Sequence, residues 1–159
     1  MVTMTHNECN YWLKIALYMP DIPQNTASII RTCSCLGALL EIIEPCGFHT
    51  SDKRFKRVVM DYFNDSGIRF YKDEKHFFKS KENERIILMT TKAKKNYTDF
   101  KFKKNDTLLF GRESCGVPEK IHKKLKYKLK IPMINKSRSL NISTSVSITM
   151  SEAIRQINC

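Results

Sequence analysis

The sequence predicts an α/β domain with a mostly parallel sheet flanked by helices. Three observations lead to this prediction: short apolar runs recur along the chain, most of them end at a proline or a glycine, and amphipathic or basic segments separate them. Short continuous apolar runs suit strands that are buried on both faces of a parallel sheet. Strand and helix in alternation are typical of an α/β domain.

The strands are expected at six apolar runs, of which the run at 68–71 is the weaker candidate. Proline ends three of the runs and glycine ends a fourth, and both residues are common where a strand gives way to a turn. In chain order the expected strands are 13–20, 39–45, 68–71, 86–91, 107–111 and 127–132.

Four segments between and after these runs have helical patterns: 25–37, 52–60, 118–125 and 141–157. Asp52 is expected to cap the second segment, and Pro118 suits the first turn of the third. In the fourth segment, apolar residues recur on one stripe at spacings of four and three, which predicts an amphipathic helix. The stripe consists of Ile142, Val146, Met150, Ile154 and Ile157.

The chain of 159 residues has the length of one domain, and we expect residues 12–159 to form it after a loose tail at 1–11. The first residues lack the basic and apolar regions of a signal peptide, and no apolar run approaches the roughly 20 residues of a membrane helix. We therefore expect a cytoplasmic protein with no membrane partner. The six cysteines include no C-x-x-C pair and no histidine at zinc-finger spacing, so we expect reduced thiols and no metal.

The formal net charge of +12 is concentrated in the middle of the chain. The segment 53–130 holds 23 of the 28 basic residues and 10 of the 16 acidic ones. Such a surplus favours a polyanionic partner, because neutralised phosphates release condensed counterions. Compositional drift toward lysine is the alternative.

The loops after the strands are the candidate sites, because ligands of open α/β sheets bind beyond the carboxyl ends of the strands. The first loop, 20–33, opens a helix at Asn25 and carries Arg31 about two turns later. Free backbone N–H groups and a guanidinium there suit a phosphate or a ribose. In the alternative interpretation, Asn25 only caps the helix and Arg31 is a solvated surface residue.

Two further loops carry more than turn chemistry. The segment 108–121 holds Gly111 and Gly116, and glycine lets backbone approach a ligand closely. Its pattern matches neither the Rossmann fingerprint nor the P-loop, and the alternative is a tight turn that leaves Glu113 exposed. The segment 135–141 has far more hydrogen-bonding capacity than a turn requires, so we expect a bound ligand there.

Taken in order, NTASIIR, FGRESCGVP and IPM…SRSLNIS resemble the three motifs of the SpoU branch of the SPOUT RNA methyltransferases, and in particular of its small TrmL/YibK-type tRNA ribose 2′-O-methyltransferases. The resemblance runs from about residue 13 to residue 156. It implies a minimal catalytic domain with a deep trefoil knot in its C-terminal half. It also implies S-adenosylmethionine as methyl donor and a homodimer with active sites at the interface.

The resemblance assigns roles to the residues that match motif positions. Asn25, Arg31 and Asn141 are implied to be catalytic, and Asn25 and Arg31 face the substrate ribose and phosphate. Arg31 is expected to clamp that phosphate and orient the hydroxyl, because a guanidinium stays protonated and is a poor base; a direct base role is the alternative. The implied cofactor pocket consists of Met89, Gly111, Glu113, Gly116, Ile131, Met133, Ser139 and Leu140.

A chain without a separate RNA-binding domain must hold tRNA with its own surface. The expected phosphate contacts are Lys53, Arg54, Arg57 and Arg138.

The chain departs from the usual family pattern at five positions, which bear on how the RNA is placed. Ala27 and Ser28 stand where the family usually has Gly-Asn, and Arg112 stands where proline is common. Cys115 replaces a common arginine and Ser151 a frequent tyrosine.

The expected function is transfer of a methyl group to the ribose 2′-hydroxyl of the wobble nucleotide, cytidine or uridine 34, in the anticodon stem-loop of tRNA. Leucine isoacceptors are the expected substrates. One alternative is the same chemistry at another tRNA or ribosomal RNA ribose. Another is a basic RNA-binding protein that keeps the fold without turnover. A nucleotide-binding oxidoreductase is disfavoured, because no Gly-rich fingerprint follows a strand.

Overall fold

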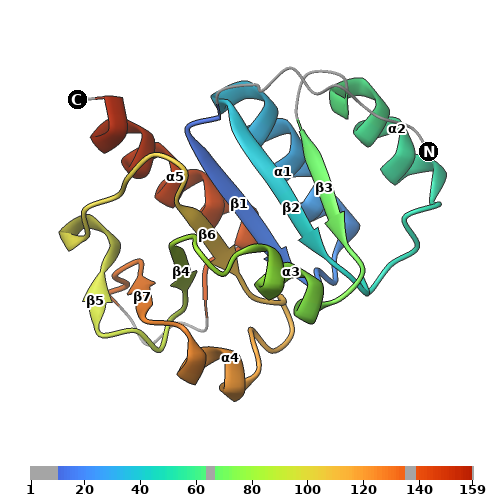
Figure 1. Ribbon diagram of the computed structural model, residues 1–159. Coiled ribbons are helices and arrows are strands. Elements are labelled where there is room, and N and C mark those ends of the chain that lie inside the picture. Colours follow the sequence, from blue (N-terminus) through green and yellow to red (C-terminus); the bar gives the residue numbers. More distant parts are fainter. Residues whose placement is uncertain (1–10, 64–66, 135–138, 159) are drawn as a thin grey trace.

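The sheet is built from β1 (Leu13–Tyr18), β2 (Ala38–Ile43), β3 (Ile68–Tyr71), β4 (Ile86–Met89), β5 (Lys95–Asn96), β6 (Thr107–Phe110) and β7 (Tyr127–Lys130). The computed structural model describes residues 11–63, 67–134 and 139–158. Within these ranges the strands form one sheet in the order β3-β2-β1-β6-β4-β7-β5, and every pair is parallel (Figure 1). Strands β2, β4 and β6 are buried along their whole length, as expected of central parallel strands.

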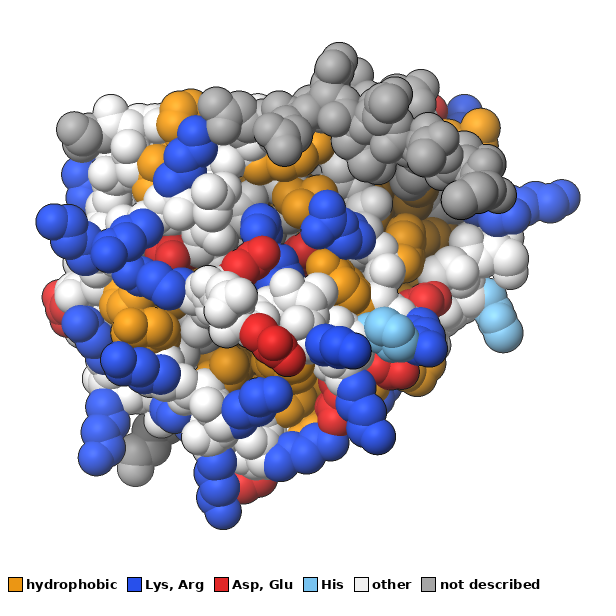
Figure 2. All heavy atoms as spheres, in the orientation of Figure 1, with side chains coloured by type: hydrophobic (Ala, Val, Ile, Leu, Met, Phe, Trp, Pro, Cys, Tyr) orange, Lys and Arg blue, Asp and Glu red, His pale blue; other side chains and the backbone are white. Residues whose placement is uncertain are grey.

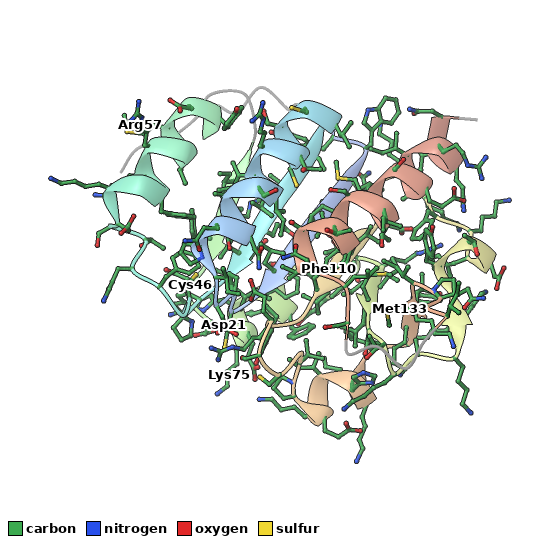
Figure 3. The ribbon with its side chains drawn as sticks, turned by 180° about the vertical axis from the view of Figure 1, so that it is seen from behind. Asp21, Cys46, Arg57, Lys75, Phe110 and Met133 are labelled. Atoms are coloured by element: carbon green, nitrogen blue, oxygen red, sulfur yellow. The ribbon has the colours of Figure 1, made fainter. Side chains whose placement is uncertain are left out.

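Helices cover both faces of the sheet (Figures 1 and 3). One face carries α1 (Pro23–Leu36) and α5 (Ile142–Asn158), with α2 (Lys53–Phe63) packed on α1. The other face carries α3 (Glu74–Ser80) and α4 (Glu119–Lys124), and a short 3-10 turn, η1 (Tyr97–Asp99), follows β5. In the described part of the chain, no helix combines the length and apolar character needed to cross a membrane.

Two apolar clusters, one on each face of the sheet, form the core. Under α1 and α5, the side chains of Ile15 and Leu17 meet Ile30 and Met150. On the opposite face, Phe77 of α3 and the apolar residues of α4 pack on the sheet. The apolar stripe predicted for the last helix is confirmed, because all five of its members belong to or pack against the first cluster: Ile142, Val146, Met150, Ile154 and Ile157.

The predicted α/β architecture is confirmed, and each of the six expected strands is present. Two elements, β5 and α3, were not predicted. The strand β5 consists of two polar residues, and α3 buries a single side chain, Phe77. Neither element therefore leaves an apolar pattern in the sequence.

The ends of the helices correct one expectation and confirm another. The expected start of α1 at Asn25 is wrong, because the helix begins at Pro23, whose fixed φ and missing N–H suit a first helical position. The Asn25 side chain lies within the first turn and takes part in other contacts. The cap of α2 is confirmed, since the Asp52 carboxylate accepts a hydrogen bond from Phe55 N at 3.1 Å.

The expected loose tail, 1–11, lies outside the described residues except for Tyr11. The hydroxyl of Tyr11 accepts a hydrogen bond from the backbone N–H of Gly67 at 2.7 Å, next to the start of β3. Tyr11 therefore belongs to the folded part of the chain.

The order of the strands decides which loops meet. Strands β1, β6, β4 and β7 are consecutive neighbours in the sheet, although they lie far apart in the sequence. Because the strands are parallel, their carboxyl ends lie at one edge of the sheet. The loops that follow them, from Met19, Gly111, Thr90 and Ile131 onward, therefore begin side by side.

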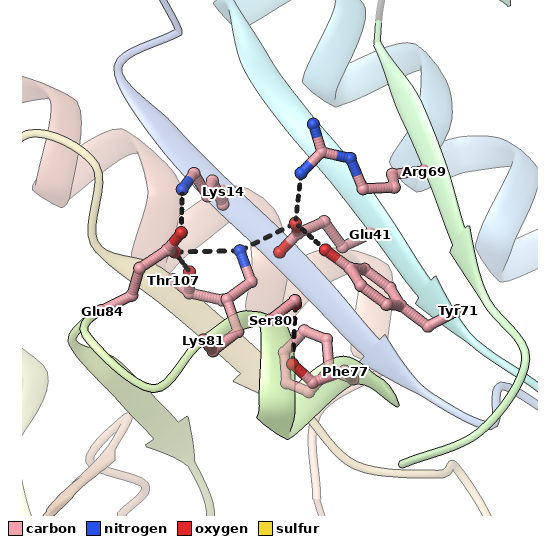
Figure 4. Close-up of polar contacts among 9 residues, drawn as sticks. All are labelled: Lys14, Glu41, Arg69, Tyr71, Phe77, Ser80, Lys81, Glu84 and Thr107. Atoms are coloured by element: carbon pink, nitrogen blue, oxygen red, sulfur yellow. Dashed lines mark hydrogen bonds and ion pairs between the residues drawn. The ribbon is translucent and has the colours of Figure 1, made fainter. Parts of the chain in front are cut away.

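A buried network of charges fixes α3 to the sheet (Figure 4). The Glu41 side chain in β2 is fully buried and lies 2.8 Å from the Nζ atom of Lys81, the residue that follows α3. Glu41 also accepts a hydrogen bond from the Tyr71 hydroxyl at 2.9 Å. Lys81 makes a second ion pair, at 2.9 Å, with Glu84, which in turn pairs with Lys14 of β1 at 2.8 Å.

Replacement of Lys81 by methionine removes the 2.8 Å ion pair of the buried Glu41 carboxylate and leaves it only the longer one, to Arg69 at 3.7 Å. We expect Lys81→Met to lower the free energy of unfolding by about 3–5 kcal/mol, measured by urea denaturation. The matched control is Lys79→Met, which changes an exposed lysine in the last turn of α3 and is expected to stay within about 0.5 kcal/mol of the wild type. A loss below about 1 kcal/mol for Lys81→Met would show that the pair does not anchor α3.

Candidate functional site

A cavity of about 480 Å³ opens at the carboxyl edge of the sheet, where the loops after β1, β4, β6 and β7 meet. Its floor is formed by strand ends, including Leu88, Met89 and Phe110. Its walls come from the loops and from the first turns of α1 and α5. Figure 3 shows Asp21, Phe110 and Met133 in this region and Arg57 of α2 well away from them.

The residues that the family resemblance assigns to the cofactor all line this one cavity. They are Met89, Gly111, Glu113, Gly116, Ile131, Met133, Ser139 and Leu140. Asn25 and Asn141, which the resemblance assigns to catalysis, line the same cavity. The structure therefore brings together residues that come from four separate stretches of sequence.

The loop between β6 and α4 depends on glycine at both of its ends. A Cβ atom at Gly111 would lie 2.6 Å from the backbone of Gly116, which is too close for any side chain. Arg112 and Gly116 close the loop with two backbone hydrogen bonds of 3.0 and 2.9 Å. Gly116 has a φ of 70°, in the left-handed region, and a Cβ there would meet no protein atom. Its missing side chain leaves space at the cavity wall.

The carboxylate of Asp21, in the loop after β1, holds this glycine loop in place. It accepts a hydrogen bond from Arg112 Nε at 3.0 Å, and Arg112 Nη2 binds the same oxygen. Its other oxygen accepts from the backbone N–H and the hydroxyl of Ser114, at 3.2 and 2.6 Å. The hydrogen bond from Arg112, together with those from Ser114, lowers the pKa of Asp21 to about 2. The arginine that replaces the family's common proline is therefore engaged with Asp21.

A chain of hydrogen bonds links the three motif loops. Glu113 accepts hydrogen bonds from the backbone N–H of Asp21 at 2.8 Å and from Asn25 Nδ2 at 3.2 Å. The Oδ1 atom of Asn25 accepts a hydrogen bond from Asn141 Nδ2 at 3.0 Å. Asn141 Oδ1 in turn accepts from the Ser143 backbone N–H at 2.9 Å, at the start of α5. Asn141 therefore caps α5 with one end of its amide and holds Asn25 with the other.

Sequence reasoning missed several polar residues at this site, among them Asp21, Thr90 and His122. Thr90 Oγ1 and His122 Nε2 lie 3.0 Å apart, and both residues line the cavity. Thr90 directly follows β4, and its place at the carboxyl end of a strand could have indicated a site residue. The contact between Thr90 and His122 joins residues 32 apart in the chain, and no local pattern predicts it.

Arg31 is not among the residues that line the cavity. It is exposed on α1, and its guanidinium carbon lies 5.9 Å from the centroid of the Tyr62 ring of α2. Lys53 and Arg57 are exposed on α2, also outside the lining. The side chain of Arg54, and Arg138 as a whole, lie outside the described residues.

The cavity fits the cofactor that the resemblance implies, S-adenosylmethionine. Its volume lies within the range of about 300–1,000 Å³ that is typical of small-ligand sites. Apolar side chains such as Ile131 and Met133 suit a purine ring, and the hydroxyl and amide groups of Ser139 and Asn141 suit a ribose. Among the described residues, no group of three or more His, Cys, Asp or Glu side chains is arranged to hold a metal ion.

A cavity with polar and apolar lining at the carboxyl edge of a parallel sheet is typical of the small-ligand sites of α/β domains. Residues 13–151 match the model of the SpoU rRNA Methylase family. The chain belongs to this family, and the resemblance predicted from its three motifs is confirmed.

The chain is similar to curated relatives along most of their length. It is 41% identical over 145 residues to a tRNA (cytidine(34)-2′-O)-methyltransferase of Beijerinckia indica. The matched residues make up 90% of this chain and 91% of the relative. It is 39% identical over 147 residues to the Escherichia coli protein of the same name, with 91% and 94% covered.

Solved structures share the fold. One solved structure, described as giving structural insights into the 2-OH methylation of C/U34 on tRNA, superposes on this chain with a TM-score of 0.86. The two are 34% identical, and the match covers 92% of this chain and 97% of the other. The SpoU methyltransferase AviRb of Streptomyces viridochromogenes, in complex with AdoMet, gives a TM-score of 0.80 at 23% identity, over 92% of this chain and 58% of the other.

The low pKa of Asp21 predicts an acid-dependent loss of stability. Because the pKa in the folded protein lies below the ordinary value of 3.8, the ionised carboxylate stabilises the fold above about pH 4, and this contribution is lost as the pH falls toward 2. We expect the difference in free energy of unfolding between wild type and Asp21→Asn to be constant from about pH 7 to pH 5 and to shrink from about pH 4 to pH 2. Urea denaturation at several pH values measures it. A difference that is flat or grows through the acid range would contradict the role of Asp21.

Proposed function

We propose that this chain is a tRNA ribose 2′-O-methyltransferase, which transfers a methyl group from S-adenosylmethionine to the 2′-hydroxyl of the wobble nucleotide, cytidine or uridine 34. The observation that carries the proposal is the meeting of three motif loops at one cavity, joined by Glu113, Asn25 and Asn141. The names of the relatives that are 41% and 39% identical support the tRNA position. Leucine isoacceptors as substrates and a cytoplasmic location are part of the same proposal.

The cofactor would be held by the residues at the floor and walls of the cavity. When bound, S-adenosylmethionine supplies a methyl group on a sulfonium, which is electrophilic without a metal ion. Gly111 and Gly116 let the backbone approach it closely. The protein must then align the ribose hydroxyl with that methyl group, a task of positioning more than of charge stabilisation. Asn25 and Asn141, joined by a hydrogen bond of 3.0 Å at the cavity wall, are placed for this task.

Arg31 acts in this proposal as a clamp on the phosphate next to the target nucleotide. Its position on α1, outside the lining of the cavity, supports this role over that of a base, because a base must come within hydrogen-bond distance of the hydroxyl. A guanidinium also stays protonated and binds phosphate well. The proton of the hydroxyl then passes to the phosphate or to water.

The deep trefoil knot and the homodimer complete the proposal. Membership of the SpoU family supports both. The order of the strands is consistent with the knot, because β6 lies between β1 and β4 although it follows both in the sequence, and the chain returns from β7 to place α5 against α1. Exposed apolar side chains at both ends of α1, Ile22 and Leu36, suit a protein interface.

Methyl transfer from labelled S-adenosylmethionine to undermodified tRNA, followed by nuclease digestion, tests the proposal directly. We expect a 2′-O-methyl nucleotide at position 34. Arg31→Ala is expected to lower kcat/KM by at least roughly tenfold, because it removes a charge-assisted contact to phosphate. Arg31→Lys is expected to retain a large part of the activity, since an ammonium also binds phosphate.

Each part of the proposal has its own contrary result. Methylation of a different tRNA or ribosomal RNA ribose would support the methyl-transfer reaction but contradict nucleotide 34 as its target. Binding of RNA without any transfer would favour a protein that retains the fold without turnover. Full transfer by Arg31→Ala, with unchanged affinity for tRNA, would remove Arg31 from the site.

A further inference from the structure

A second cavity, of about 760 Å³, lies between α3 and α4 on the face of the sheet opposite α1 and α5. Two aromatic side chains, Phe78 and Tyr127, contribute to its walls. Seven basic side chains also line it: Lys75, Lys79, Lys81, Arg85, Lys120, Lys124 and Lys126. The acidic side chains in its lining are Glu74, Glu82 and Glu84. We call this cavity the α3–α4 groove.

Much of the positive charge of the α3–α4 groove is not neutralised by the protein. Glu74 pairs with Lys120, and Glu84 pairs with Lys81 and Lys14. Four exposed lysines of the lining have no ion pair within the described part of the chain: Lys75, Lys79, Lys124 and Lys126. Figure 2 shows lysine and arginine side chains around apolar ones on the face that carries α3 and α4.

Two lysines of the groove lie over aromatic rings. The Nζ atom of Lys124 lies 4.3 Å from the centroid of the Phe78 ring, and that of Lys126 lies 5.3 Å from the Tyr127 ring. A groove lined by several cations suits a nucleic acid, because the cations can follow the phosphates.

Helix α4 separates the groove from the candidate active site. Its residue His122 lines the cofactor cavity, whereas Lys120 and Lys124 line the groove. Because a helix with its side chains is about 10 Å across, one RNA molecule can span both sites. The opposite wall of the groove, α3, is anchored to the sheet by the buried pair of Lys81 and Glu41 (Figure 4). An ion pair between Glu74 and Lys120 links the two walls.

We propose that the α3–α4 groove binds the phosphate backbone of the tRNA substrate at nucleotides beside the one that enters the cofactor cavity. This inference rests on the proposed function, and it adds a binding surface distinct from α2, where sequence analysis placed Lys53, Arg54 and Arg57. The groove holds the RNA and takes no part in the methyl transfer itself.

The test uses the full-length double variant Lys79→Gln/Lys124→Gln, which removes one unpaired cation from each wall. We expect the Kd for tRNA to rise roughly tenfold at about 0.15 M salt, and the slope of log K against log salt to fall in magnitude by about 1.4–1.8, which corresponds to two lost phosphate contacts. The value of kcat at saturating tRNA and the Kd for S-adenosylmethionine are expected to stay unchanged, because neither residue lines the cofactor cavity.

The matched control is Lys101→Gln/Lys103→Gln, which removes two exposed lysines of the loop before β6 that do not line the α3–α4 groove. We expect this control to bind tRNA with the wild-type salt slope. An unchanged slope in the groove variant, or an equal loss in the control, would overturn the proposal. So would binding to phosphatidylserine vesicles that the groove variant loses while it keeps its affinity for tRNA.

The two levels of the proposal fail separately. Absence of methyl transfer by the wild-type protein at nucleotide 34 counts against the proposed function. Normal transfer by the wild type, combined with an unchanged KM for tRNA in the groove variant, counts against the groove alone.

Discussion

The carboxylates of Asp21 and Glu113 hold together the part of the molecule on which the candidate active site depends. Each belongs to one loop and binds the other loop: Asp21 accepts hydrogen bonds from Arg112 and Ser114, while Glu113 accepts from the backbone of Asp21 and from Asn25. Because the contacts are reciprocal, neither loop can move without breaking several charge-assisted bonds, which are about twice as strong as neutral ones. The cavity walls are therefore set before a ligand arrives.

Because β1 and β6 pair in parallel, residues about 90 positions apart in the chain can make these contacts. Leu17 of β1 is in register with Phe110 of β6, so the two loops leave neighbouring strand ends. The same geometry places α4 between two surfaces. One side of this helix faces the cofactor cavity through His122, and the other faces the basic groove through Lys124. In the proposed function, the cofactor and the RNA therefore lie on the two sides of a single short helix.

The parts of this structure that could be predicted are those that leave a local pattern in the sequence. Apolar runs predicted the central strands, and the stripe from Ile142 to Ile157 predicted α5. The motif resemblance predicted which residues line the cavity. Two ion pairs could not be predicted: that of Asp21 with Arg112 and that of Glu41 with Lys81. Each joins residues that only the order of the strands brings together. The polar strand β5 and the short helix α3 escaped prediction because tertiary contacts, more than their own sequences, stabilise them.

The claim that the linked loops form one preorganised cofactor site is tested most directly by calorimetry with S-adenosylmethionine. The comparison is between the wild type, Glu113→Gln, and the control Glu119→Gln at an exposed position of α4. In Glu113→Gln, an amide N–H₂ faces donors at Asp21 or Asn25, so we expect the Kd for S-adenosylmethionine to rise by roughly tenfold or more. Glu119→Gln is expected to bind like the wild type. Wild-type affinity in Glu113→Gln would contradict the claim.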